Sequence, residues 1–181
     1  MKTHLIRFLE AALVVACMSA TIAAGGNVTK TVTVDSMRIE LHVLPAEPFF
    51  TAGEVAAQHA SQGMLVMGGA APAAPDAQSR PNHHLVVHVF NAKTGAAVTD
   101  AVVIMNFRPL DDKGKPSGAS VNVPVVVMQA IGKGAQSTHY GNNVFMAAGS
   151  YAVNVTVNGK PAHFKATVAG SDSDMKHEMH M

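Results

Sequence analysis

The chain has no tryptophan and a single cysteine, Cys17, among its 181 residues. One cysteine cannot form an intramolecular disulfide, so the fold must be held by an ordinary hydrophobic core. Charged residues make up only 14% of the chain, with 13 Lys and Arg against 12 Asp and Glu. A chain this close to neutral, without a basic cluster, does not favour nucleic acid as a partner.

Common catalytic motifs are also missing. The sequence has no Gly-x-Ser-x-Gly elbow and no phosphate-binding loop, and once a leader that includes Cys17 is removed it has no cysteine nucleophile. The adjacent acids Asp111 and Asp112 sit in a turn sequence beside Lys113. Two acids brought together from distant parts of the chain leave no motif, so a site built on two carboxylates stays open as an alternative. We expect a binding protein rather than an enzyme.

The beginning of the chain has the composition of a secretory signal peptide. Two basic residues precede an apolar run, residues 11–24, that ends in small residues. The run is short for a bilayer span, which favours cleavage near Ala23 or Ala24 over a membrane anchor. Lipidation at Cys17 is the alternative to simple cleavage. We therefore expect a periplasmic protein with a signal peptide over residues 1–24.

Alternation of apolar and polar residues predicts a mostly β chain. The predicted strands cover residues 28–34, 37–44, 64–67, 84–90, 101–107, 121–128, 143–147, 150–157 and 162–168. Asn158-Gly159 is typical of a type I′ hairpin turn, which needs positive φ at both central positions. Thr51 and Glu54 form a capping-box pattern, which predicts one short helix over residues 52–60.

Strands at this spacing, without helical periods between most of them, predict an immunoglobulin-like antiparallel β-sandwich with an N-terminal strand pair and one short helix. Tyr151, ahead of a valine-rich strand, resembles the tyrosine corner of such sandwiches, whose hydroxyl bonds nearby backbone. We expect one domain over residues 25–169. Within it, residues 68–81 are rich in Ala, Pro and Gly and predict a flexible loop. Residues 170–181 predict a disordered tail rich in Met and His.

Histidine and methionine are frequent, with 10 and 11 copies. His139 lies within Ser-Thr-His-Tyr-Gly-Asn-Asn, residues 137–143, at a turn ahead of an expected strand. Met128 ends the preceding valine-rich strand, out of phase with its core-facing valines. An imidazole and a thioether on the two sides of one loop suit copper, or a site shared by copper and iron, better than magnesium or calcium. The alternative is a turn with an incidental histidine, in a metal-free interaction module.

A second histidine is expected to join this site. His84 and His88 share the strand face opposite the core-facing residues. Their backbones are roughly 13 Å apart on a strand, too far for both to bind one ion through bonds of ~2 Å. We therefore expect His84 to meet His139, with His88 outside the site. Glu40 is the acid in a suitable phase to add a carboxylate. Residues 129–137 predict a loop long enough to cover the site.

The last residues of the chain, Met-Lys-His-Glu-Met-His-Met, concentrate the same ligand types again. They follow a polar spacer, so we expect a flexible secondary metal-binding tail, and the alternative is a terminus without a specific role. The candidate ligands of this tail are Met175, His177, Met179, His180 and Met181.

The run that starts at His139, the methionine ahead of it and the His-Leu strand at His84 resemble the periplasmic iron-transport accessory proteins. The sequence Met-Arg-Ile-Glu-Leu from Met37, followed by Leu-Pro, is also similar to theirs. The resemblance implies an immunoglobulin-like sandwich that binds copper through His and Met. It further implies a homodimer that works beside an inner-membrane iron permease. The ligands that it implies are His84, Met128 and His139.

Three positions depart from the family's pattern. The family has an acidic residue two places after its strand histidine, where this chain has Val86, and its methionine lies closer to its His-Tyr-Gly than Met128 does. A further family histidine has only His163 as a loose counterpart. The departures disfavour an iron site that needs the missing carboxylate, whereas a copper site keeps its His and Met ligands. Periplasmic copper-resistance sandwich proteins are the neighbouring possibility, so the expected function is copper or iron uptake or homeostasis.

Overall fold

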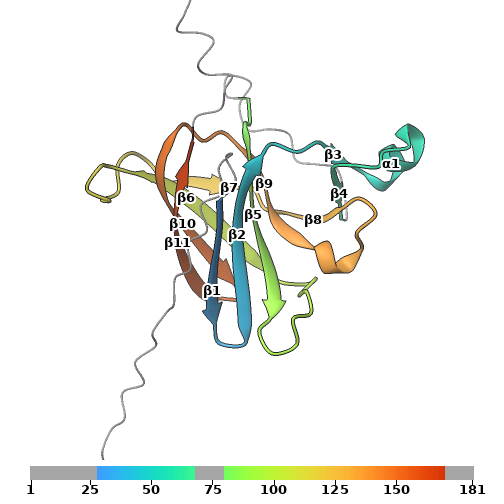
Figure 1. The fold of residues 1–181 in the computed structure, drawn as a ribbon, viewed down its shortest axis with the longest axis horizontal. Helices are drawn as coiled ribbons and strands as arrows, with labels where there is room; N and C mark the ends of the chain where they lie inside the picture. The colour runs from blue at the N-terminus through green and yellow to red at the C-terminus, as the bar shows by residue number, and fades with distance from the viewer. Residues whose placement is uncertain (1–27, 68–79, 170–181) are drawn as a thin grey trace, which may run out of the picture.

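The computed structural model of the protein describes residues 28–67 and 80–169. These residues form two β-sheets packed face to face, with one short helix at the side (Figure 1). The larger sheet has 7 strands in the order β1-β2-β5-β9-β8-β4-β3, and the smaller sheet has 4 in the order β11-β10-β6-β7. The all-β sandwich expected from the sequence is therefore confirmed.

Most strands lie where the alternation of the sequence predicts them. The larger sheet contains β1 (Val28–Val34), β2 (Met37–Pro45), β3 (Phe49–Phe50), β4 (Met64–Val66), β5 (His83–Asn91), β8 (Val126–Ala130) and β9 (His139–Val144). The smaller sheet contains β6 (Val103–Leu110), β7 (Val121–Val123), β10 (Gly149–Val157) and β11 (Lys160–Val168). Within the described residues every strand pair is antiparallel except β3 with β4. The short β3 was not expected.

The predicted helix is also present, as α1 (Ala52–Gln58). The Thr51 hydroxyl accepts from the Glu54 N–H at 3.3 Å, and the Glu54 carboxylate accepts from the Thr51 N–H at 2.7 Å. These two bonds form the expected capping box, which satisfies N–H groups that the first turn leaves free. The helix ends earlier than expected because His59 adopts the left-handed conformation.

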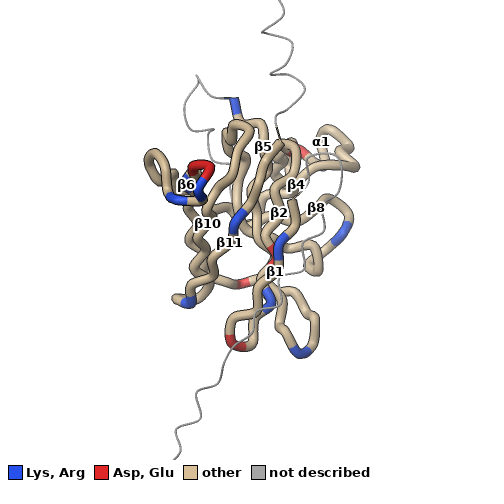
Figure 2. Tube along the Cα trace, turned by 60° about the vertical axis from the view of Figure 1, so that its left-hand side comes forward, with Lys and Arg blue, Asp and Glu red and all other residues tan. Residues whose placement is uncertain are grey.

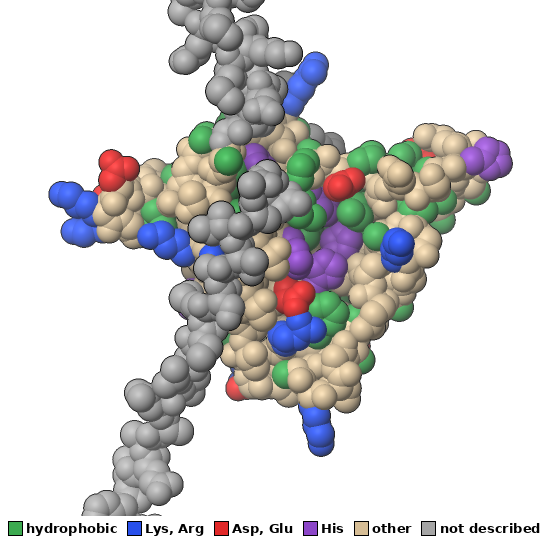
Figure 3. All heavy atoms as spheres, in the orientation of Figure 1, with side chains coloured by type: hydrophobic (Ala, Val, Ile, Leu, Met, Phe, Trp, Pro, Cys, Tyr) green, Lys and Arg blue, Asp and Glu red, His purple; other side chains and the backbone are tan. Residues whose placement is uncertain are grey.

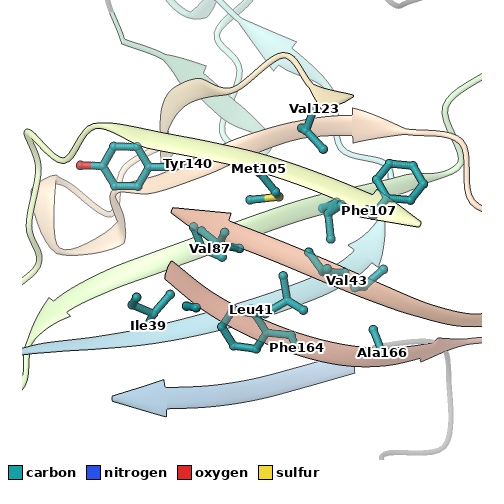
Figure 4. Close-up of a cluster of buried hydrophobic side chains, with 14 of the residues drawn as sticks. Ile39, Leu41, Val43, Val87, Met105, Phe107, Val123, Tyr140, Phe164 and Ala166 are labelled. Atoms are coloured by element: carbon teal, nitrogen blue, oxygen red, sulfur yellow. The ribbon is translucent and has the colours of Figure 1, made fainter. Parts of the chain in front are cut away.

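Alternate residues of the facing strands meet in one core between the sheets. In β2, for example, Ile39, Leu41 and Val43 are fully buried, whereas the residues between them are partly exposed. Figure 4 shows side chains from both layers in contact: Ile39, Leu41, Val43 and Val87 from the larger sheet, and Met105, Phe107, Phe164 and Ala166 from the smaller one. The side chains on the outer face of the larger sheet therefore do not contribute to this core.

Two buried tyrosines fasten loops to the core. The Tyr151 hydroxyl donates to the Ala147 carbonyl at 2.8 Å, which is the bond expected of a tyrosine corner. The Tyr140 hydroxyl donates to the Val98 carbonyl at 2.7 Å and accepts from the Ala101 N–H at 3.0 Å. Because Tyr140 directly follows His139 and points into the core, it fixes the histidine on the opposite face of β9.

One expected strand is in fact two. The run 121–128 divides into β7, which pairs with β6 in the smaller sheet, and β8, which pairs with β4 and β9 in the larger sheet. Pro124 lies at the division, and it has no N–H to donate to a continuous ladder. The prediction of one strand was therefore wrong, and the face of Met128 has to be counted from Val126 within β8.

The strand expected over residues 143–147 was misplaced. It is β9, which begins at His139 and lies between β5 and β8 near the middle of the larger sheet. The Gly-Asn-Asn sequence looked like a turn, but Gly141 serves a close approach instead. A Cβ atom on Gly141 would lie 2.1 Å from the carbonyl oxygen of Leu85 and 2.7 Å from the Cα of Val86.

Several expectations fall outside the described residues. These are the signal peptide over residues 1–24 with Cys17, most of the loop 68–81, and the tail 170–181 with its Met and His residues. Within the described part of the chain, no helix has both the length and the apolar character needed to cross a membrane.

Candidate metal centre

Histidine side chains gather in one patch on the outer face of the larger sheet (Figure 3). They come from three adjacent strands: His42 from β2, His84 and His88 from β5, and His139 from β9. The positions of Lys, Arg, Asp and Glu residues along the chain are instead spread over turns and separate strand positions (Figure 2). The distinctive chemistry of this face is therefore that of imidazole.

The four rings contact one another in a row. The ring centroids are 4.9 Å apart for His42 and His88, 5.0 Å for His88 and His139, and 5.5 Å for His139 and His84. His139 thus lies between the two histidines of β5 and contacts both. Residues on one face of adjacent strands are close neighbours, which explains why alternation on three strands produces a continuous row.

The Nε2 atoms of His84 and His139 lie 3.4 Å apart. The Nδ1 atom of His84 is 2.9 Å from Oδ1 of Asn143. Glu47 fixes the orientation of that amide, because its carbonyl accepts from Asn143 Nδ2 at 2.7 Å and its N–H donates to Oδ1 at 3.3 Å. Since Oδ1 is an acceptor, Nδ1 of His84 carries the proton and Nε2 carries the lone pair.

His139 has the same tautomer for a similar reason. Its Nδ1 atom is 2.8 Å from the carbonyl oxygen of Ser137, and a carbonyl can only accept. The lone pair of His139 is therefore on Nε2, and it faces the lone pair of His84. Two facing acceptors are unfavourable for neutral imidazoles but suit a shared cation. An ion about 2.0–2.1 Å from both nitrogens would bind them at an angle of about 110°, the tetrahedral value.

Burial keeps these rings neutral. It lowers the pKa of His84 to about 4, and the hydrogen bond that His84 donates to Asn143 only partly opposes this. Burial also lowers the pKa of His88 to about 3, with a further contribution from the neighbouring histidines. The pKa values of His139 and His42 are lowered as well, again by burial. Metal binds neutral imidazole, so near neutral pH no proton has to leave these ligands first.

Met128 lies beside the histidine row. It is directly opposite His139 in the pairing of β8 with β9. Its side chain is fully buried in a small apolar cluster with Val66 and Val86, separate from the main core. Met128 therefore lies outside the main core, as expected, although the reason is the division between β7 and β8. A thioether and an apolar wall adjoin the row on this side.

Glu40 lies at the other end of the row. It is opposite His88 in the pairing of β2 with β5, and one of its carboxylate oxygens pairs with Arg38. The other oxygen is 3.6 Å from Nε2 of His42. Arg38 also covers the ring of Phe90, with its guanidinium carbon 4.3 Å from the centroid. Glu40 therefore adjoins His42 and not the pair formed by His84 and His139.

The expectation that His88 lies too far from His139 to adjoin the site is wrong, because their ring centroids are 5.0 Å apart. The backbone spacing argument ignored the direction of the side chains, which converge on the ring of His139 from both sides. Gly141 lies opposite Val86, between the two histidines of β5, and it contributes no side chain there. The position that a side chain of residue 141 would take is occupied by Leu85 and Val86.

His42 was missed altogether. Its phase was visible, because it follows Glu40 by two positions in an alternating strand. What could not be known was that β2 lies beside β5, since that is a long-range pairing. Its Nδ1 atom is 3.3 Å from Oγ1 of Thr29, whereas its Nε2 atom is buried and has no hydrogen-bond partner among the described residues.

The two remaining expectations concern His163 and the segment 129–137. His163 lies on β11 of the smaller sheet, where it is exposed and its Nδ1 is 2.8 Å from Oδ1 of Asn154. It is thus on the opposite layer from the histidine row. The segment 129–137 supports the rings through its backbone, because Ser137 accepts from His139. It is tied to a neighbouring turn, since Gln136 donates to the carbonyl of Gly95 at 2.9 Å.

Only two of the candidate metal donors in the described part of the chain, the Nε2 atoms of His84 and His139, already face each other. Within residues 28–67 and 80–169, no three His, Cys, Asp or Glu side chains already form a ligand set for one ion. Comparisons with protein-family models, curated proteins and solved structures gave no significant match. The resemblance to iron-transport accessory proteins therefore stays a prediction. Any function has to be argued from the geometry of the row.

Proposed function

We propose that the protein binds copper at the pair formed by His84 and His139. The observation that carries this proposal is that two buried Nε2 lone pairs are held 3.4 Å apart, each by a hydrogen bond on the far side of its ring. Histidine ligands of metals commonly donate their second ring N–H to a carbonyl or carboxylate in this way. The two rings thus have the tautomer and the orientation that a metal requires.

The metal we propose is copper, because the neighbouring donor is soft. Met128 lies next to His139, and two imidazoles with a thioether suit Cu(I). Cu(II) would take a further nitrogen or oxygen ligand, for which water suffices. Since only two nitrogen donors of the described residues face each other, Met128 must change rotamer when the ion binds.

A metal-free interaction module is the competing function. A polar cluster that only shaped the fold would pair acceptors with donors, because a buried acceptor without a donor is unfavourable. At His84 and His139 two acceptors face each other instead. This is the specific point at which the metal-binding proposal accounts for the geometry better.

The cellular setting we propose is the one that the sequence predicts. The protein would act in the periplasm after removal of residues 1–24, as a homodimer beside an inner-membrane metal permease, in copper or iron uptake or homeostasis. The intact mass of the protein isolated from its native cells tests the first step. A chain that begins at Cys17 and carries a diacylglyceryl group would contradict simple cleavage.

Titration with Cu(I), Cu(II), Fe(II) and Zn(II), monitored by native mass spectrometry, tests the function. We expect copper to bind most tightly. His139→Ala should weaken copper binding about 100-fold or more, since changes in groups that merely hold a ligand already reduce affinity 10–100-fold. The matched control is His163→Ala, which removes an exposed histidine from the other sheet. If a folded His139→Ala variant binds copper as tightly as the parent, the proposal fails.

A further inference from the structure

We propose that His42, His88 and Glu40 form a second subsite, which binds a divalent first-row transition cation beside the copper. The proposal rests on the proposed function only in treating the histidine row as a metal site. Its ligands are different, and so is the number of ions that it predicts. Nothing in the sequence predicted this subsite, because His42 and His88 were not expected in the row.

The first observation concerns His42. Its Nε2 atom is buried without a hydrogen-bond partner among the described residues, and it faces a carboxylate oxygen of Glu40 at 3.6 Å. That distance is too long for a hydrogen bond between the two atoms. An ion about 2.0–2.2 Å from both would bind them at an angle of about 120°, which a four- or five-coordinate cation accepts.

The second observation supplies a third donor. His88 is directly opposite Glu40 in the sheet, and its ring centroid is 4.9 Å from that of His42. The ring of His88 contacts the rings of both His42 and His139. In neutral imidazole only one nitrogen carries a proton, so the other keeps its lone pair. A rotation of this ring brings the third ligand to the ion.

The donor set decides the class of metal. Two imidazoles and a carboxylate, without sulfur, favour a divalent cation such as Zn(II), Fe(II) or Cu(II) over Cu(I). The side chains of His42 and Glu40 each keep 21% of their surface exposed, whereas His84 is fully buried. The second subsite is therefore at the end of the row that solvent reaches. The two ends of the histidine row therefore differ in the softness of their donor atoms and in their exposure to solvent.

Zn(II) is the probe, because it has no redox chemistry that would disturb copper. Zinc equivalents per chain are counted by native mass spectrometry for the parent, His42→Ala, Glu40→Gln and His163→Ala, each confirmed as folded by thermal unfolding. We expect His42→Ala to bind one equivalent less than the parent. Glu40→Gln should weaken that equivalent about 10-fold or more, and His163→Ala should match the parent. Zinc bound elsewhere is common to all four proteins and cancels in the comparison.

The outcomes separate this inference from the copper proposal. If His42→Ala and Glu40→Gln keep the full zinc count and affinity, the second subsite is overturned, whatever happens to copper. It is also overturned if His42→Ala loses copper but keeps all its zinc, because His42 would then be a copper ligand. If His139→Ala loses copper and keeps the zinc equivalent that depends on His42, the two sites are distinct, as we infer.

Discussion

The tautomers of His84 and His139 depend on groups that do not themselves contact the proposed ion. Asn143 and Ser137 each accept from an Nδ1 atom, and this leaves both Nε2 lone pairs on the inner side of the row. The smaller sheet contains a matched pair, in which Asn154 and His163 make the same kind of bond at 2.8 Å. That second pair is exposed and has no ring neighbour among the described residues, so the chain provides its own control.

Asn143→Ala should weaken copper binding without changing the number of ions bound. The expected effect is roughly 10–100-fold, because His84 loses the acceptor that fixes its tautomer and ring orientation. Competition with a chelator of known affinity measures it. Asn154→Ala should leave the affinity unchanged. Equal affinities in the two variants would contradict the supporting role of Asn143.

A second prediction at the same scale concerns pH. His84 has a pKa lowered from 6.5 to about 4 and His88 one lowered from 6.5 to about 3, in both cases mainly by burial. The unfolded chain therefore takes up protons first as pH falls below about 6.5. The free energy of unfolding of the metal-free protein should decrease from there down to about pH 3–4, on the order of 3–5 kcal/mol per histidine.

Denaturant unfolding at a series of pH values, in the presence of a chelator, measures this dependence. His88→Gln should flatten it in part, because one buried histidine no longer titrates. His163→Ala, which changes an exposed residue, should not alter its slope. A parent protein whose stability is constant between pH 7 and pH 4 would show that the rings are not buried as neutral groups.

At the scale of elements, the centre depends on β9 lying between β5 and β8. Gly141 allows this arrangement, because any Cβ there would meet Leu85 and Val86 of the neighbouring strand. Other elements tolerate change more easily. Gly53 in α1, for example, has open space around the position of a Cβ, apart from ordinary contact with Thr51.

Gly141→Ala should lower the free energy of unfolding by about 1–3 kcal/mol or more, as expected for overpacking against backbone. It should also separate β5 from β9 locally, and so weaken copper binding. Gly53→Ala is the matched control, expected to stabilise the protein by roughly 0.5–1 kcal/mol because alanine favours the helix. Chemical unfolding and copper titration of both variants test this. A Gly141→Ala variant as stable as the parent would contradict the close approach of the strands.

Sequence reasoning succeeded where the pattern is local. Alternation found β1, β2, β5, β10 and β11, and the capping box found α1. It failed at Pro124, where the chain passes from one sheet to the other, and at β9, whose Gly-Asn-Asn composition is that of a turn. The same restriction to local patterns explains which residues of the site were predicted. His139 and His84 were paired from their phase, whereas His42 and the position of His88 depend on which strands lie side by side.

At the scale of the whole molecule, the main core and the candidate centre lie on opposite faces of the larger sheet. The core fills the space between the two sheets, and the histidine row lies outside it. Changes in metal ligands should therefore affect binding more than folding. The smaller sheet is likewise complete without the residues that follow β11, because β11 pairs with β10 along its whole length up to Val168.

Removal of residues 175–181 should lower the number of metal ions bound but leave the unfolding temperature of the metal-free protein unchanged. The reason is that the last strand ends at Val168, and a polar spacer separates it from the Met- and His-rich segment. Native mass spectrometry and thermal unfolding of the full and shortened chains measure the two effects. Combining the truncation with His139→Ala should give additive losses of metal, because independent sites do not share ligands. A fall of several degrees in the unfolding temperature would show instead that the segment packs on the sandwich.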